Sequence, residues 1–107
     1  MKGVAILGST GSIGKSTLDV ISRNPDEYRV VALSANTDVP GMLAQCRQFR
    51  PTLVAMADSE AARAVSEALK AEGLGVEVMV GPAGLEAVAT HPDAEITVAA
   101  IVGAAGL

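Results

Sequence analysis

Residues 4–17 read Val4-Ala5-Ile6-Leu7-Gly8-Ser9-Thr10-Gly11-Ser12-Ile13-Gly14-Lys15-Ser16-Thr17. A short apolar run ends in three glycines spaced three residues apart, and a helical pattern follows, so the stretch predicts a strand, a tight turn and a helix. Gly8 lets the chain leave the strand sharply, Gly11 lets a phosphate approach the backbone, and Gly14 lets the helix pack close to the strand. The first N–H groups of such a helix favour an anion. The stretch therefore predicts a phosphate-binding turn in a nucleotide-binding fold.

The rest of the chain repeats the alternation of strand and helix. The pattern predicts strands at 3–7, 28–34, 52–56, 76–80 and 96–100, and helices at 12–22, 39–49, 59–72 and 83–89. In the first helix we expect Ile13, Thr17, Val20 and Ile21 to face the core, with Leu18 beside them. Regular alternation with short turns favours one α/β domain built on a doubly wound parallel sheet, a Rossmann-like NAD(P)-binding domain.

Composition narrows the class of partner. Half of the 107 residues are hydrophobic, only Tyr28 and Phe49 are aromatic, and the formal net charge is −4. No basic patch stands out, so we expect no nucleic-acid partner. The longest apolar run, 96–107, is too short to span a membrane.

Two features bear on the cellular compartment. Cys46 is the single cysteine, which fits a reducing compartment, and no transit peptide precedes the first strand. These features predict a cytoplasmic protein with a buried, structural Cys46.

Two kinds of nucleotide site fit the glycine-rich stretch. The Gly-x-x-Gly-x-x-Gly spacing is a variant of the dinucleotide fingerprint, and it stands between a strand and a helix, as that fingerprint requires. The alternative is a P-loop, because the segment from Ser9 to Ser16 departs from the Walker A pattern only where Ser9 replaces glycine. Asp58, which follows an apolar run, could then be the Walker B acid, although we favour a helix N-cap for it. We favour the dinucleotide site; a P-loop protein should instead bind Mg-ATP.

The loop after the second strand bears on which dinucleotide binds. An NAD site often places an acid directly at this strand end to bind the ribose hydroxyls, and none stands there. Ser34, Asn36 and Thr37 could instead bond a 2′-phosphate, but the loop has no Lys or Arg, and Asp38 would repel a phosphate if it pointed inward. The residues favour NADP and leave NAD open.

The titratable residues form no evident catalytic set. His91 precedes a proline in a turn and is expected to be an exposed loop residue, while Glu60, Glu67 and Glu72 mark a solvated helix face. We therefore predict no catalytic residue and no metal ligand in this chain.

Four segments together resemble one family. They are Gly8-Ser-Thr-Gly-Ser-Ile-Gly14, Ser16-Thr-Leu-Asp-Val20, Arg29-Val-Val-Ala-Leu33 and Ala99-Ala-Ile-Val-Gly-Ala-Ala-Gly-Leu107. In this combination they resemble the N-terminal domain of 1-deoxy-D-xylulose 5-phosphate reductoisomerase over the whole chain. The resemblance implies an NADPH-dependent oxidoreductase and isomerase of isoprenoid biosynthesis. With the help of a divalent metal it rearranges its phosphorylated sugar substrate to an aldehyde, which NADPH reduces to 2-C-methyl-D-erythritol 4-phosphate. It also implies a homodimer at full length.

The resemblance also implies roles for particular residues. Thr10, Gly11, Ser12 and Ile13 should cradle the cofactor phosphates, Asn36, Thr37 and Asp38 should hold the adenine ribose and its 2′-phosphate, and Ala100 and Ile101 should line the nicotinamide end. Family members often carry Gly-x-Asn in the second loop, where this chain has Asn36-Thr37-Asp38.

We expect residues 1–107 to be an N-terminal domain that is incomplete at its C-terminus. Its apolar end at 96–107 has no polar tail, and the family's metal-binding, catalytic and C-terminal parts are expected to lie beyond it. The fragment alone should then be inactive. A different Rossmann enzyme, such as a semialdehyde dehydrogenase, would need a catalytic cysteine, and Cys46 in the middle of a helix does not suit that role.

Overall fold

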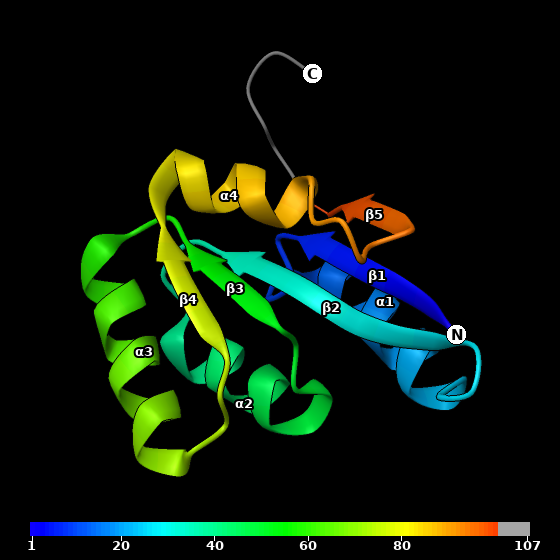
Figure 1. The fold of residues 1–107 in the computed structure, drawn as a ribbon, viewed down its shortest axis with the longest axis horizontal. Helices are drawn as coiled ribbons and strands as arrows, with labels where there is room; N and C mark the ends of the chain where they lie inside the picture. The colour runs from blue at the N-terminus through cyan, green and yellow to red at the C-terminus, as the bar shows by residue number, and fades with distance from the viewer. Residues whose placement is uncertain (101–107) are drawn as a thin grey trace.

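A computed structural model describes residues 1–100 of the chain (Figure 1). Every predicted element is present, and the bounds agree to within one residue except that α4 begins two residues earlier than expected, at Gly81. The elements are β1 (Lys2–Leu7), α1 (Ser12–Arg23), β2 (Tyr28–Ala35), α2 (Val39–Phe49), β3 (Leu53–Met56), α3 (Ser59–Glu72), β4 (Glu77–Val80), α4 (Gly81–Ala89) and β5 (Ile96–Ala99).

Within the described residues the five strands form one parallel sheet in the order β4-β3-β2-β1-β5. The helices α1, α2 and α3 cover one face, and α4 crosses the other face as the chain returns from β4 to β5 (Figure 1). The direction of winding therefore reverses beside β1, where ligands bind in doubly wound sheets. The predicted doubly wound α/β fold is confirmed.

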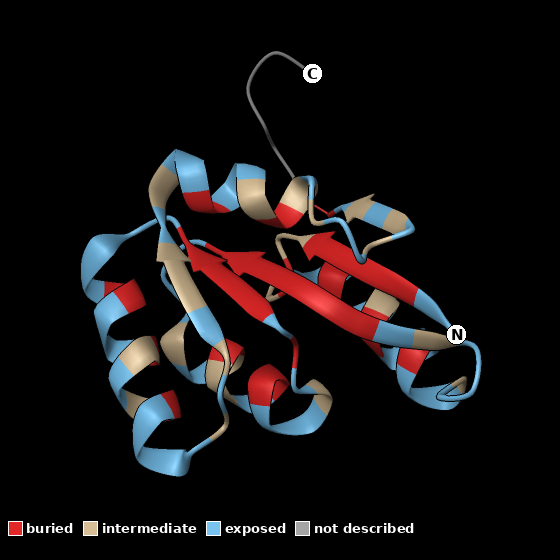
Figure 2. Cartoon of the chain, in the orientation of Figure 1, coloured by how far each residue is buried: buried red, intermediate tan, exposed pale blue. Residues whose placement is uncertain are grey.

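The core has one layer on each face of the sheet. On the side of α1–α3 it contains large side chains, among them Ile6, Leu33, Met42 and Met56, all fully buried. On the side of α4 it is thinner and richer in alanine, and Gly84 lets that helix approach the sheet closely. The strands β1, β2 and β3 are buried along nearly their whole length (Figure 2), as expected for a parallel sheet covered on both faces.

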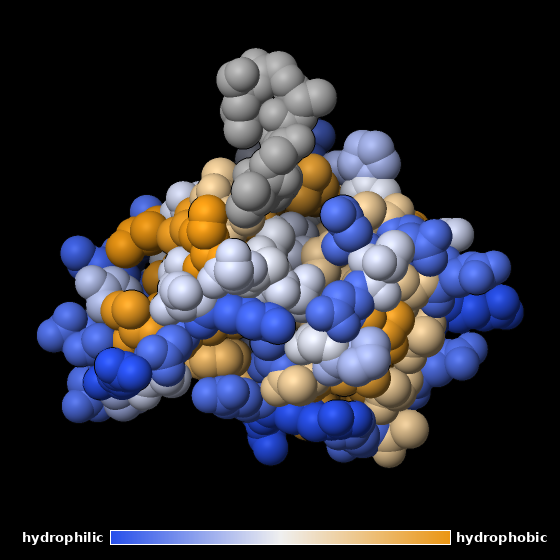
Figure 3. Space-filling view, turned by 180° about the vertical axis from the view of Figure 1, so that it is seen from behind, coloured by the Kyte–Doolittle hydropathy of each residue, from blue (hydrophilic) through white to orange (hydrophobic). Residues whose placement is uncertain are grey.

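The buried side of α1 differs from the sequence prediction. Gly14, Leu18 and Ile21 face the sheet, whereas Ile13 is 50% exposed and Val20 is 55% exposed. The expected inner stripe through Ile13 and Val20 was therefore wrong, because the neighbouring stripe through Gly14 and Leu18 packs against the sheet. On the face seen from behind, other apolar side chains also reach the surface, in separate patches among hydrophilic ones (Figure 3).

This orientation predicts different costs for two substitutions on one helix. Leu18→Ala removes a buried side chain and should lower the free energy of unfolding by about 2–4 kcal/mol, whereas Val20→Ala should change it by less than ~0.5 kcal/mol. Urea unfolding followed by circular dichroism measures both. Equal losses for the two variants would contradict the orientation of α1.

None of the helices within residues 1–100 is long and apolar enough to cross a membrane.

Candidate functional site

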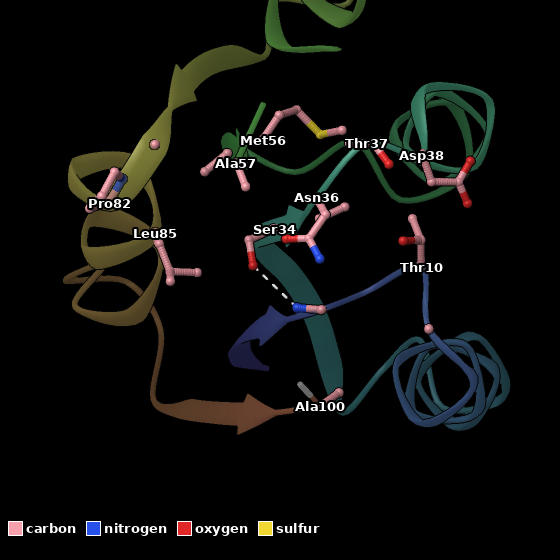
Figure 4. A pocket seen from close by; sticks show the side chains of 15 residues that line it. Thr10, Ser34, Asn36, Thr37, Asp38, Met56, Ala57, Pro82, Leu85 and Ala100 are labelled. Carbon is pink, nitrogen blue, oxygen red and sulfur yellow. Dashed lines mark hydrogen bonds between the residues drawn. The ribbon is translucent and has the colours of Figure 1, made fainter. Parts of the chain in front are cut away.

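A cavity of about 510 Å³ opens where the carboxyl ends of the strands meet (Figure 4). The residue that follows each of the five described strands lines it, namely Gly8, Asn36, Ala57, Gly81 and Ala100. This edge of a doubly wound sheet, next to the point where winding reverses, is where such folds bind their ligands. All five described strands therefore end at this cavity, which makes it the candidate ligand site.

The turn from β1 to α1 depends on two glycines for different reasons. Gly8 has a φ of 81°, in the left-handed region that favours glycine. Gly14 has an ordinary helical backbone, but a Cβ there would overlap the carbonyl oxygen of Gly8 and lie 2.6 Å from the Cα of Ser9. The close approach expected at Gly14 is thus confirmed, and it holds the start of α1 against the end of β1.

The first turn of α1 is left open toward this edge of the sheet. Gly11 is its N-cap, and among residues 1–100 no side chain caps the helix and no acid stands in its first turn. By contrast, Asp38 caps α2 by accepting from Gly41 N–H at 2.9 Å, and Asp58 caps α3 by accepting from Ala61 N–H at 2.9 Å. A Cβ on Gly11 would meet only the Gly8 carbonyl oxygen, at 3.6 Å, so the fold itself does not require glycine there. An anion at this helix end would find free N–H donors and the positive end of the dipole.

Two buried residues, Ser34 of β2 and Gln45 of α2, hold the turn from outside it. The Ser34 carbonyl accepts from the N–H groups of Gly8 and Ser9 at 3.0 and 2.8 Å, and the Ser34 hydroxyl accepts a longer bond of 3.2 Å from Gly8 N–H (Figure 4). From α2, Gln45 Nε2 donates to the Ser9 carbonyl at 2.8 Å. Ser34 was considered above only as a phosphate ligand, and Gln45 was missed. A glutamine in a helix is ordinary, and no sequence signal shows a partner 36 residues away.

The loop after β2 forms another wall of the cavity. Asn36 and Thr37 line it with an amide and a hydroxyl, and Asp38 is the only charged residue that lines it among residues 1–100. The Asp38 side chain lies beside α2 (Figure 4), and its carboxylate accepts from the Gly41 N–H in the first turn of that helix. Neither Lys nor Arg lines the cavity within the part of the chain that the structure describes.

The structure brings most of the predicted site residues together. Thr10 and Gly11 line the cavity with the loop after β2 and with Ala100, whereas Ser12 and Ile13 begin α1 and line a shallow hollow on its outer side. Ile101 lies outside the described residues.

One wall of the cavity is apolar, and none of its residues was predicted from the sequence. Met56 and Ala57 come from the end of β3, and Pro82 and Leu85 come from α4 (Figure 4). In a parallel sheet the carboxyl ends of β3 and β4 lie at the same edge as that of β1. The predicted topology therefore already indicated that residues after these strands would line the cavity. The crossing of α4 over the sheet brings Leu85 to the site.

The P-loop alternative finds no support in this geometry. Asp58 caps α3 and follows β3, which is separated from β1 by β2. Lys15 is exposed on α1 and is not among the residues that line the cavity. The interpretation of Asp58 as an N-cap is confirmed.

No group of three or more His, Cys, Asp or Glu side chains that could hold a metal ion occurs among the described residues. His91 lies in the turn before β5, where its Nδ1 accepts from Asp93 N–H at 3.1 Å. Glu72 is exposed, as expected for a solvated helix face, and it also forms a two-pronged ion pair with Arg47 of α2, at 2.8 and 2.7 Å. The Arg47 guanidinium lowers the pKa of the Glu72 carboxyl through this hydrogen bond.

Cys46 is a packing residue of α2. It is fully buried, and burial raises the pKa of its thiol to about 11, against the smaller opposing effect of Arg47. Because the thiolate is the reactive form, we expect Cys46 to react with a disulfide reagent at about pH 8 at least roughly a hundredfold more slowly than in the urea-unfolded chain. Absorbance of the released thiol measures both rates, and equal rates would contradict the burial.

Comparison with known proteins places this geometry in a family. The family model of 1-deoxy-D-xylulose 5-phosphate reductoisomerase matches residues 4–107. The reductoisomerase of Methylococcus capsulatus is 57% identical over 108 residues, which cover 100% of this chain and 27% of that enzyme. The Anaeromyxobacter sp. enzyme is 55% identical with the same coverage. The chain therefore spans about a quarter of the length of these relatives.

Solved structures agree with the sequence matches. A crystal structure of DOX-P reductoisomerase in complex with NADPH, fosmidomycin and magnesium superposes with a TM-score of 0.92 at 37% identity, covering 100% of this chain and 26% of that one. The Zymomonas mobilis enzyme in complex with NADPH superposes with a TM-score of 0.85 at 39% identity, covering 94% of this chain and 26% of that one. The chain therefore belongs to the 1-deoxy-D-xylulose 5-phosphate reductoisomerase family.

Proposed function

We propose that this chain is the N-terminal NADPH-binding domain of an enzyme that rearranges and reduces 1-deoxy-D-xylulose 5-phosphate to 2-C-methyl-D-erythritol 4-phosphate. The observation that carries the proposal is the cavity at the carboxyl ends of all five described strands, lined by the glycine-rich turn that opens α1. Two solved relatives with the same fold contain NADPH, which supports the choice of cofactor.

The cofactor would lie along the edge of the sheet. The N–H groups of Ser12 and Ile13 would bind the diphosphate, because the first turn of α1 is left uncapped within residues 1–100, and Thr10 and Gly11 would contact it from the turn that lines the cavity. Ala100, with Ile101 after it, would line the nicotinamide end beside β1.

The loop after β2 would hold the adenine ribose. Asn36 and Thr37 offer neutral donors to a 2′-phosphate, and Asp38, engaged as an N-cap, would reach the ribose rather than the phosphate. The apolar side chains of Met56 and Leu85 would pack against the adenine ring.

Bound NADPH would supply the hydride for the reduction, and this chain would bind and orient it. The divalent metal and the phosphorylated sugar would be held by parts of the enzyme beyond residue 107. The chain alone would then be inactive, and the whole enzyme would be a homodimer. The lone, buried Cys46 fits a reducing compartment, so we place the enzyme in the cytoplasm.

The test is turnover by a full-length protein. A fusion of this chain to the remaining three quarters of the Methylococcus capsulatus enzyme should oxidise NADPH only when 1-deoxy-D-xylulose 5-phosphate and a divalent metal are both present. Absorbance at the nicotinamide band follows the reaction. A folded fusion that binds Mg-ATP and shows no such turnover would favour the P-loop alternative and overturn the proposal.

A further inference from the structure

The backbone of Ser9 is held from two sides in the β1–α1 turn, through its N–H and its C=O. Its N–H donates to the Ser34 carbonyl of β2 at 2.8 Å, and its C=O accepts from Gln45 Nε2 of α2 at 2.8 Å. Ser9 is fully buried and Gln45 is 8% exposed, so water competes little for either contact. Two neighbouring elements therefore fix the segment that leads into the uncapped start of α1.

The same two residues carry the buried polar atoms that lack a partner among residues 1–100, namely Ser9 Oγ and Gln45 Oε1. A hydroxyl can donate and an amide oxygen accepts, so the two groups are complementary. Replacing Gln45 by a hydrophobic residue of similar size would be the natural choice for packing alone, because a buried amide without full hydrogen bonding lowers stability. The glutamine at this position therefore indicates a role other than filling space in the core.

One helix also connects the two halves of the cavity. Asp38 caps α2 in the loop after β2, and Gln45 lies seven residues further along the same helix, about 10 Å at 1.5 Å per residue. The loop that lines the cavity on one side is therefore held by the N-terminus of α2, and the turn that lines it on the other side is held by a residue about two turns further along the same helix.

We propose that Gln45 is a positioning residue for cofactor binding, which holds the Ser9 carbonyl so that the N–H groups at the start of α1 are directed to the cofactor diphosphate. The inference rests on the proposed function, since it assumes that the cavity binds NADP(H). Gln45 does not touch the cofactor; it acts through the Ser9 peptide and sets the spacing between the phosphate turn and the ribose loop.

The first test replaces the amide and keeps its volume. Gln45→Met should weaken NADP⁺ binding by roughly tenfold, about the effect of one lost hydrogen bond. In the full-length fusion it should raise the KM for NADPH and leave kcat within about twofold, because the reacting atoms are untouched. The matched control is Cys46→Ala, which removes buried packing from the next position of α2 without touching the turn. The control should bind NADP⁺ as the unsubstituted chain does.

A second variant gives a pH signature that loss of packing would not produce. In Gln45→Glu the buried carboxylate cannot donate to the Ser9 carbonyl, but its protonated form can. Burial raises the pKa of a carboxyl group, so NADP⁺ affinity relative to the unsubstituted chain should recover as the pH falls from about 8 to about 6. A flat ratio across this range would count against the proposal.

A third readout needs no substitution and covers the case in which the variants do not fold. In the unsubstituted chain, the side-chain amide signal of Gln45 in a ¹⁵N spectrum should shift when NADP⁺ binds, because its hydrogen-bond partner adjoins the phosphate turn. If the unsubstituted chain binds NADP⁺ but this signal does not move, or if Gln45→Met binds as tightly as Cys46→Ala, the role of Gln45 is refuted. If the unsubstituted chain does not bind NADP⁺, the proposed function fails instead.

Discussion

Gly11→Asp is expected to abolish NADPH binding while leaving the fold at least as stable as before. Gly11 is the N-cap of α1 with an extended backbone, φ −78° and ψ 173°, which any residue can adopt. Aspartate is a better N-cap than glycine, so the free energy of unfolding should stay equal or rise by roughly a few tenths of a kcal/mol. The substitution therefore separates binding from folding.

The loss of binding follows from the position of the new charge. A carboxylate at this cap would take up the helix N–H groups that we assign to the diphosphate. Two like charges ~4 Å apart repel by ~4 kcal/mol at an effective dielectric constant of ~20, so affinity should fall at least ~100-fold. Fluorescence titration with NADPH, beside urea unfolding, measures both effects.

The control for this experiment is Ser16→Asp, which adds the same charge on the outer side of α1, next to the shallow hollow rather than the cavity. It should bind NADPH with at most a few-fold loss. If the Gly11→Asp protein binds NADPH with an affinity within twofold of the unsubstituted chain, the diphosphate does not bind at this turn.

Gly14→Ala should have the largest effect on stability of any single methyl group added to the turn. The new Cβ would overlap the Gly8 carbonyl oxygen and lie 2.6 and 2.7 Å from Ser9 Cα and C, all backbone atoms that cannot rotate away. Alanine gains ~1 kcal/mol in helix propensity, but overpacking of this kind costs up to ~3 kcal/mol, so we expect a net loss of about 2 kcal/mol.

The urea midpoint measures this loss, and Ser16→Ala, on the exposed side of the same helix, is the control that should not be destabilised. A Gly14→Ala protein as stable as Ser16→Ala would mean that α1 does not approach β1 as closely as the structure shows.

These two glycines also explain how far the sequence could predict the fold. The glycine spacing and the apolar runs located every strand and helix, because turn residues and periodicity are local signals. The position of Gly14 in the sequence also indicates the correct orientation of α1. If Gly14 must face β1, then Leu18 and Ile21, four and seven residues later, must face it too, and Val20 cannot.

Other parts of the site depend on contacts that no local pattern encodes. The hydrogen bond from Gln45 to Ser9 joins residues 36 apart, and Leu85 reaches the cavity because α4 crosses the far face of the sheet. Asn36 and Thr37 were predicted from their position after β2, and the family resemblance added Asp38, but only the structure shows that the Asp38 carboxylate is engaged as an N-cap.

The most direct test of the central proposal is a ¹⁵N chemical-shift titration of this chain with NADPH. We expect the largest amide shifts to fall on residues 8–13, 36–38, 57, 81 and 100, the backbone around the cavity at the strand ends. Shifts that fall on other surfaces, or no shifts at millimolar NADPH in a folded chain, would contradict it.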